Sequence, residues 1–398
     1  MATLGVLVFA FALLGSIALH ELGHLLTAKK FGMKASRYFI GMGPTLWSTR
    51  RGETEYGVKA FPIGGFVKIV GMTQLEELED PADEPRAFWR QPAPQRAVVL
   101  AAGSAMHFLI ALGLLFGALV AFGEPAKNTT RVEQVYECLQ PDPKTDCAGK
   151  PPAPAAAAGF RRGDRIVELD GMPVADWTKD FSEPIHAHAA GPATIVVLRD
   201  GARVPINVSI ERIPVKGDDG KETTEGRIGV APGELKKASP VAAIGRTGSL
   251  TWELMTGSVK ALVEIPGKIP ALFRDTATGK ERSIEDGAPL SVVDIGRFSA
   301  DAFSARNFLA VLSMLAALNV FIGLFNLLPL LPLDGGHLAI LVFEVVRSKI
   351  ATLLGWRDPG RVDLRKLMPA MVGFIVVMGS LTLVLLYAGI TNPIASPF

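Results

Sequence analysis

The sequence has 398 residues, of which 49% are hydrophobic, and a mean hydropathy of +0.31. A soluble protein of this length would be less apolar, so the composition favours a membrane protein. The formal net charge of +2 excludes the strongly basic balance of a nucleic-acid-binding protein, and no nucleic-acid partner is expected.

Four apolar runs are each near or above the length of about 20 residues that spans a bilayer. They cover Leu4–Leu19, Ala97–Phe122, Phe308–Leu331 and Leu367–Ile390. The corresponding transmembrane helices are placed at residues 1–28, 97–122, 308–332 and 367–390. The first run has no Lys or Arg before it and continues into a polar motif, so we expect a retained helix, not a signal peptide. The predicted fold class is a polytopic α-helical membrane protein with four transmembrane helices.

The distribution of Lys and Arg predicts the orientation of these spans. The segment between the first and second spans is basic, and so is the segment between the third and fourth, whereas the tail after Ile390 carries no basic residue. The positive-inside rule therefore places both basic segments in the cytoplasm. Both termini and the long central region are expected on the outside.

The first span ends in the sequence His-Glu-Leu-Gly-His at residues 20–24. His20 and His24 lie one turn apart on the same face of a helix, so both can reach one metal ion. Glu21 beside them can act as general base on a water that the metal activates. Each ionisable group costs about 2.5–3.5 kcal/mol at the centre of a membrane helix, so three together indicate a function. The alternative is a polar helix end with histidines at the headgroup level.

Residues 29–96 are expected to form a cytoplasmic or membrane-dipping β region. Between Ser36 and Gly71, β-branched and aromatic residues alternate with glycines, as in short strands and turns. A Gly-x-Gly loop at Gly41 and Gly43 can expose backbone N–H and C=O groups to which an extended peptide adds as a strand. An ordinary cytoplasmic hairpin is the alternative.

Residues 129–214 are predicted to form a separate small domain outside the membrane. Strands are expected at Val132–Tyr136, Arg165–Leu169, Ala193–Leu198 and Val204–Ile210. Cys138 and Cys147 bracket a short loop: outside the cell a disulfide is plausible, whereas free thiols are expected in the cytosol.

Two further segments precede the third span. Residues 235–275 carry apolar residues at close to helical spacing with Lys and Arg between them, which favours amphipathic interfacial helices over helices packed on the spans. The polar segment 276–300 is expected to be irregular.

The third span leads into a second polar motif, Leu-Asp-Gly at residues 333–335. A catalytic zinc usually takes three protein ligands and leaves one position open, and Asp334 is the best candidate for the third ligand. The alternative is that Asp334 caps a cytoplasmic-side helix predicted at residues 333–347. Asn326, in the same span, can hydrogen-bond a substrate backbone or a developing oxyanion.

These two motifs resemble those of the bacterial site-2 proteases, the intramembrane zinc metalloproteases of regulated intramembrane proteolysis. The resemblance implies one zinc ion held by His20, His24 and Asp334, with Glu21 as the catalytic base. It also implies that Asn326 holds substrate.

The resemblance extends over most of the chain. Residues 40–43 resemble the membrane-dipping β-loop of the family. Residues 129–214 resemble a single PDZ domain, an α+β fold, and the one-PDZ layout with a cysteine pair is most similar to the actinobacterial branch. The implied location is the bacterial inner membrane.

The resemblance also implies the partners. The substrate would be a single-span membrane protein, either an anti-sigma factor or a remnant signal peptide, and an upstream site-1 protease would trim the same substrate first. The PDZ-like domain would then exclude untrimmed substrates. Two other classes of protein are weighed against this enzyme. A catalytically silent PDZ-containing adaptor would not need Glu21, and a metal transporter would carry polar groups along more than one span.

One motif departs from the family pattern. Where the family usually has Gly-Pro-x-x-Asn in the second span, residues 103–107 read Gly-Ser-Ala-Met-His. The change leaves the implied zinc residues intact and bears on how this helix packs or contacts substrate. We interpret His107 as a buried, hydrogen-bonded histidine; a direct metal ligand is the alternative.

Overall fold

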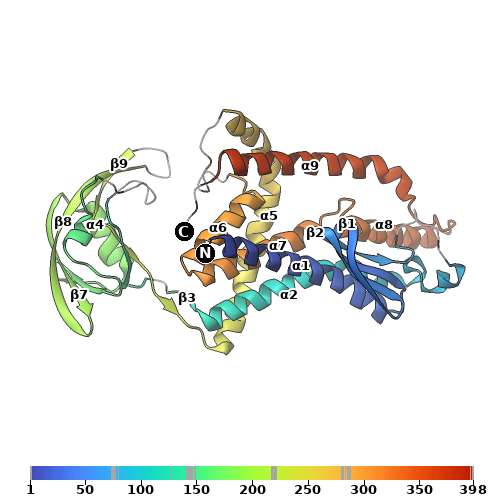
Figure 1. The fold of residues 1–398 in the computed structure, drawn as a ribbon, viewed down its shortest axis with the longest axis horizontal. Coiled ribbons are helices and arrows are strands. Elements are labelled where there is room, and N and C mark those ends of the chain that lie inside the picture. Colours follow the sequence, from blue (N-terminus) through green and yellow to red (C-terminus); the bar gives the residue numbers. More distant parts are fainter. Residues whose placement is uncertain are drawn as a thin grey trace. The chain divides into compact units, whose positions relative to one another are not determined.

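The computed structural model describes residues 2–72, 78, 80–126, 128–139, 147, 149–216, 222–278, 282, 284, 288–394 and 396. The chain divides into two compact units (Figure 1). We call Met1–Ala118 with Pro240–Phe398 the membrane unit and Leu119–Ser239 the sheet unit.

Among the described residues, four helical stretches of the membrane unit are long and apolar enough to cross a bilayer. They are α1 (Ala2–Lys30), α2 (Ala93–Ala121), α7 (Phe308–Asn326) and α9 (Met368–Thr391) with the short helix η4 (Leu364–Leu367) before it. The prediction of four apolar transmembrane helices is therefore confirmed. Helix α7 ends at Asn326 because the following segment contains Pro329 and Pro332, which cannot continue a helix.

Strands β1 (Ala35–Arg51) and β2 (Thr54–Ile69) form a long antiparallel hairpin, which confirms a β-rich region after the first span. The first half of β1 pairs on both sides, since Phe39 lies opposite both Phe66 and Gly57. This arrangement requires a bend, which Gly41 and Gly43 provide with φ angles of +89° and +87°. The hairpin thus folds back into a small sheet beside α1.

The remaining helices of the membrane unit connect these spans. They are η1 (Pro81–Arg86), η2 (Phe88–Arg90), α5 (Pro240–Thr278), α6 (Val292–Ser304) and α8 (Asp334–Leu353). Helix α5 is continuous and packs Leu250, Leu254 and Met255 against buried residues of α2 and α7, while Trp252 stays exposed. This packed side agrees with the alternative that the segment packs on the membrane spans. A location at the membrane surface stays a prediction.

The prediction that residues 276–300 are irregular was wrong where α6 begins. Ser291 accepts a hydrogen bond from the backbone N–H of Asp294, and the Asp294 carboxylate accepts one from the backbone N–H of Ser291. This capping box starts a helix within a polar stretch. Residues 279–281, 283 and 285–287 of the predicted irregular segment lie outside the described residues.

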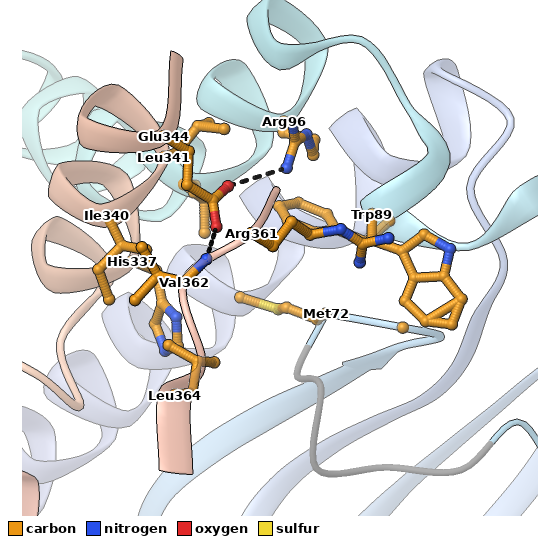
Figure 2. Close-up of a pocket in the computed structure, with 13 residues that line it drawn as sticks. Met72, Trp89, Arg96, His337, Ile340, Leu341, Glu344, Arg361, Val362 and Leu364 are labelled. Atoms are coloured by element: carbon orange, nitrogen blue, oxygen red, sulfur yellow. Dashed lines mark hydrogen bonds and ion pairs between the residues drawn. The ribbon is translucent and has the colours of Figure 1, made fainter. Parts of the chain in front are cut away.

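A small cavity of about 50 Å³ lies between α2, η2, α8 and the segment before α9 (Figure 2). Glu344 of α8 accepts a hydrogen bond from the Val362 N–H at 2.8 Å and pairs with Arg96 of α2 at 3.8 Å. The guanidinium of Arg361 stacks over Trp89, 4.9 Å from the ring centroid. These contacts hold the segment before α9 against α2 and α8.

The sheet unit is built on a mixed-length antiparallel sheet in the order β6-β5-β7-β8-β9. The strands are β5 (Arg165–Leu169), β6 (Met172–Pro173), β7 (Gly191–Arg199), β8 (Ala202–Lys216) and β9 (Glu222–Arg227). Shorter elements complete it: β3 (Glu124–Pro125), β4 (Val132–Val135), α3 (Pro154–Ala157), η3 (Trp177–Ser182), α4 (Glu183–Ala187), β10 (Val230–Pro232) and β11 (Leu235–Lys236).

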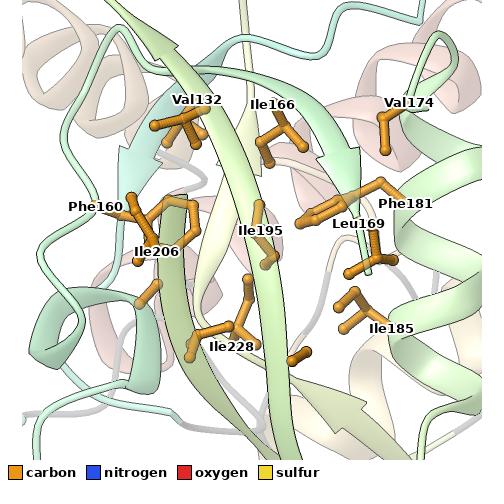
Figure 3. Packing of buried hydrophobic residues seen from close by; sticks show 14 of the residues in the cluster. Val132, Phe160, Ile166, Leu169, Val174, Phe181, Ile185, Ile195, Ile206 and Ile228 are labelled. Carbon is orange, nitrogen blue, oxygen red and sulfur yellow. The ribbon is translucent and has the colours of Figure 1, made fainter. Parts of the chain in front are cut away.

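The core of the sheet unit lies between the sheet and its short helices (Figure 3). Ile166, Ile195 and Ile206 from neighbouring strands meet Phe181 and Ile185 from η3 and α4. Alternating residues of β7 are buried, as expected for a strand with one covered face. Cys138 and Cys147 form a disulfide within this unit.

Candidate metal centre

His20 and His24 of α1 meet Asp334, the first residue of α8. The Nε2 atom of His20 lies 3.3 Å from Nε2 of His24 and 3.4 Å from Oδ2 of Asp334, and the His24–Asp334 separation is 3.2 Å. Both histidines are buried and the aspartate is partly buried. The three predicted ligands therefore converge from elements more than 300 positions apart in the sequence numbering, with one nitrogen or oxygen of each facing the others.

These three atoms fit a zinc ion. Tetrahedral zinc with ligands at about 2.0–2.1 Å separates its ligand atoms by about 3.3 Å, close to the three distances observed. The Nδ1 atom of His24 lies 2.7 Å from the Val99 carbonyl oxygen. Because a carbonyl only accepts, Nδ1 is the donor and the lone pair of the neutral ring is on Nε2, facing the centre. Oδ2 of Asp334 is buried and has no hydrogen-bond partner among the described residues, as a metal ligand atom would be.

Glycines allow α2 to approach the histidines closely. A Cβ atom added at Gly103 would lie 2.4 Å from Nε2 of His24 and 2.7 Å from Nε2 of His20. At Gly23, between the two histidines, an added Cβ would lie 2.6 Å from the Ala102 carbonyl oxygen. The space beside the ligand atoms thus depends on a residue without a side chain at position 103.

Glu21 lies between the three ligands and the hairpin. A Cβ added at Gly65 of β2 would lie 3.2 Å from Cγ of Glu21, so the strand passes directly over this side chain. The backbone N–H of Val67, also on β2, is near enough to interact with the Glu21 carboxylate. The hydroxyl of Tyr38 on β1 donates to the Ala18 carbonyl at 2.7 Å and ties the hairpin to α1. The hairpin therefore covers and orients the predicted base.

The other predicted site residues are less directly placed. Asn326 is the last residue of α7 and is half-buried. Within the described residues its side chain makes no hydrogen bond to the metal cluster. Gly41 and Gly43 face Phe61 of the same hairpin, where added Cβ atoms would come within 2.6 Å and 2.5 Å of it. Their observed contacts explain the bend in β1, and their role toward a substrate stays a prediction.

His107 on α2 is 1% exposed, and its Nδ1 lies 2.8 Å from Oδ1 of Asn319 on α7. The interpretation as a buried, hydrogen-bonded histidine is confirmed. Its ring centroid lies 5.0 Å from that of His20. The sequence analysis did not single out Asn319, although a polar residue within an apolar span is a usable signal. It also missed the Val99 carbonyl, for which the sequence carries no signal.

The cavity of Figure 2 is not the metal site. None of the predicted site residues lines it, although His337 does and stands one helical turn after Asp334. Glu344 of this cavity is paired with Arg96 and with the Val362 N–H, whereas Oδ2 of Asp334 in the metal cluster has no hydrogen-bond partner among the described residues. We therefore assign the chemistry to the metal cluster.

Comparison with known proteins shows the family. Residues 8–353 match peptidase family M50. The zinc metalloprotease Rip1 of Mycolicibacterium smegmatis is 37% identical over 412 aligned residues, which cover 99% of each chain. Rip1 of Mycobacterium tuberculosis is 38% identical over 410 residues, again covering 99% of each chain. In agreement with the resemblance to site-2 proteases inferred from the two motifs, the chain belongs to peptidase family M50.

Proposed function

We propose that this protein is an intramembrane zinc metalloendopeptidase of regulated intramembrane proteolysis, which cuts a peptide bond within a membrane-spanning segment of another protein. One observation carries the proposal: ligand atoms of His20, His24 and Asp334 converge within 3.4 Å of one another beside Glu21. His20 and His24 lie in a helix long and apolar enough to cross a bilayer, and Asp334 is the first residue of α8. Membership of family M50 and the zinc metalloprotease relatives support it.

His20, His24 and Asp334 hold one zinc ion in this proposal. When bound, zinc supplies Lewis acidity, which lowers the pKa of a water ligand and polarises the scissile carbonyl. Glu21 accepts the proton of the attacking water and delivers it to the leaving amide nitrogen. Strand β2 covers the Glu21 side chain, which limits the orientations that the base can take during both transfers.

A helical substrate hides its carbonyl groups in backbone hydrogen bonds and must unwind before it is cut. The hairpin β1–β2 lies against the cluster, and a small sheet offers edges to which an extended segment adds as a strand. In this proposal the bend at Gly41 and Gly43 and the side chain of Asn326 hold the substrate segment in an extended conformation. The membrane-dipping position of the hairpin belongs to this proposal.

The sheet unit is proposed to be a PDZ-like domain that excludes untrimmed substrates. Its antiparallel sheet, closed by the short helix α4, supports this assignment. The family resemblance supports a single-span substrate, an anti-sigma factor or a remnant signal peptide, that a site-1 protease has already trimmed. Deleting residues 129–214 should raise cleavage of untrimmed substrate relative to trimmed substrate. If the deletion left the selectivity between trimmed and untrimmed substrate unchanged, the proposed exclusion by the PDZ-like domain would be contradicted.

The activity is tested by incubating purified protein in detergent with a tagged transmembrane segment of an anti-sigma factor. Wild type is expected to cut the segment, and both a zinc chelator and Glu21→Gln should abolish the cut. Zinc content is measured in parallel, and Glu21→Gln should keep its zinc because Glu21 is not a ligand. Cleavage by Glu21→Gln at the wild-type rate would contradict the assigned base. Zinc binding without cleavage of this segment or of a remnant signal peptide would favour the adaptor.

A further inference from the structure

His107 occupies the contact between α2, α7 and the first histidine of the metal cluster. An added Cβ at Gly323 of α7 would lie 3.2 Å from Cβ of His107, so the two helices are in close contact there. The imidazole of His107 lies 5.0 Å from that of His20, centroid to centroid, at an interplanar angle of 43°. His107 is thus the ring that walls one side of His20.

The hydrogen bonds of Asn319 determine which nitrogen of His107 carries the proton. Nδ2 of Asn319 donates to the Leu315 carbonyl at 2.8 Å, so Oδ1 is the atom that faces His107. This oxygen can only accept, and Nδ1 of His107 must therefore donate. In the neutral ring, Nε2 of His107 then carries the lone pair.

His20 has the opposite need. Its Nε2 faces the other two ligand atoms, so a neutral, metal-binding His20 carries its proton on Nδ1. Nδ1 is buried and has no hydrogen-bond partner among the described residues. His24, in contrast, donates from Nδ1 to the Val99 carbonyl. Metal-binding histidines almost always donate from the second nitrogen to such an acceptor, which raises their basicity and fixes the ring.

We propose that His107 is a positioning residue of the metal centre, whose Nε2 accepts the hydrogen bond from Nδ1–H of His20. This completes a chain from Asn319 through His107 to His20, and it rests on the proposed zinc site. Two imidazoles joined by an N–H···N bond of about 2.9 Å have centroids about 5 Å apart, which matches the observed separation. The bond is not formed in the structure, where Nδ1 of His20 has no partner among the described residues, and we expect it to form on metal binding while Nε2 of His20 stays at the cluster and Nδ1 of His107 stays on Asn319.

The proposal assigns a function to the motif in which this chain departs from its family. A histidine at position 107 both donates to Asn319 and accepts from His20, and glutamine can reproduce the two roles with its amide. Phenylalanine keeps a ring of similar size and removes both. These substitutions separate the hydrogen-bonding role from packing.

The test measures zinc affinity of the full-length protein in detergent by competition of zinc chloride with a chromogenic chelator. His107→Phe should weaken zinc binding 10- to 100-fold, the usual loss when such a partner is removed. His107→Gln should stay within about fivefold of wild type, and Asn319→Leu, which leaves the ring but frees its Nδ1, should fall between them. Ser104→Ala is the matched control, because Ser104 is buried on the same helix and its hydroxyl has no partner among the described residues.

A second readout is the visible spectrum of the cobalt-substituted protein, which reports the ligand field at His20. His107→Phe should shift it, whereas Ser104→Ala should not. Wild-type zinc affinity and an unchanged cobalt spectrum in both His107→Phe and Asn319→Leu would overturn the proposal and leave the metal site standing. Equal weakening in His107→Gln and His107→Phe would also overturn it, because packing would then be the cause. Absence of zinc binding by wild type would overturn the proposed function as well.

Discussion

At the scale of single residues, Gly103 determines whether the metal cluster can form. Its missing side chain leaves the space in which Nε2 of both histidines lies. A methyl group there would stand within 2.7 Å of both nitrogens, so the two rings would have to move from the positions in which they face Asp334. The glycine of the second span is thus part of the site, although it offers no ligand atom.

Gly103→Ala is therefore expected to lose zinc. Metal content per chain, measured on purified protein, should fall from about one to below about 0.1, and proteolysis should fall with it. Gly113→Ala is the matched control on the same helix, because an added Cβ there meets nothing within 4 Å. It should keep its zinc and melt no lower than wild type, since alanine favours helix. A zinc-replete Gly103→Ala protein would contradict the close packing described.

The sequence predicts the metal ligands of the site better than the groups that hydrogen-bond and orient them. The spacing of His20 and His24 follows from helix geometry, and Asp334 follows from the depth at which topology places it. The Val99 carbonyl could not be predicted, because every residue has one and this hydrogen bond spans 75 positions. The pairing of His107 with Asn319 spans 212 positions and depends on how α2 and α7 cross.

At the scale of elements, an ion pair ties the start of β5 to the end of β7. The guanidinium of Arg199 donates to both oxygens of Asp164 at 2.7 Å, and the backbone N–H of Arg161 donates at 2.8 Å. Burial alone would raise the pKa of Asp164. These three donors outweigh it and hold the pKa of this carboxyl below its ordinary value.

The stability of the sheet unit should consequently depend on pH through Asp164. Since its pKa is lower folded than unfolded, the carboxylate stabilises the fold fully above the unfolded value of about 3.9. That stabilisation is lost as pH falls through the lower folded value. Hydrogen-exchange protection of β5 and β7 in the full chain should fall below about pH 4, and Asp164→Asn should lower the free energy of unfolding at pH 7 by about 2 kcal/mol.

The comparison of slopes is the control for this pH prediction. Asp164→Asn should lose protection less steeply than wild type below about pH 4, because it has no proton to take up at this site. Parallel loss in the two proteins would show that other groups set the acid limit. Glu211, exposed on β8 of the same unit, gives a control substitution to glutamine that should leave the slope unchanged.

Helices and strands could be predicted where a hydrophobic pattern marks them. They were missed where a helix cap determines where the element begins. The helix α6 begins in a polar stretch because Ser291 and Asp294 satisfy each other's backbone groups, and polar composition alone suggests a loop. Likewise β1 runs 17 residues because glycines let it bend and pair twice, whereas the same glycines in the sequence suggest breaks. The four spans needed only length and composition.

At the scale of the whole molecule, the disulfide gives a test of orientation. Cys138 and Cys147 are the two cysteines of the sequence, and they are joined within the sheet unit. Disulfides persist in oxidising compartments and are rare in the cytosol. This supports the proposal that the sheet unit and both termini lie outside the cytoplasm, as the basic segments predict.

Labelling of intact cells with a membrane-impermeant maleimide tests this orientation. The wild-type chain should take up label only after an impermeant reductant has opened the disulfide. As control, Lys349→Cys in a Cys138→Ser/Cys147→Ser background places one thiol on the exposed face of α8, which should react only after lysis. Labelling of wild type only after lysis would place the sheet unit in the cytoplasm. Labelling of intact cells without reductant would instead contradict the disulfide.

The overall organisation was largely predictable because each part leaves a compositional mark. The spans are apolar, the strands of the sheet unit alternate apolar and polar residues, and the connecting segments are basic. The extent of the sheet unit could not be predicted in the same way. The unit runs from Leu119 to Ser239 and includes the short strands β3, β10 and β11, which lie outside the predicted range 129–214. Strands of two or three residues lack a periodic pattern and form because a distant partner pairs with them.

The zinc centre itself is tested most directly by X-ray absorption at the zinc edge of the purified full-length protein. The structure predicts one zinc per chain, bound by light nitrogen and oxygen atoms with the scattering pattern of two imidazoles. Asp334→Ala should reduce zinc occupancy sharply, whereas Asn326→Ala should not, since Asn326 is not a ligand. An absence of zinc, sulfur among its ligands, or a spectrum unchanged by Asp334→Ala would contradict the centre formed by His20, His24 and Asp334.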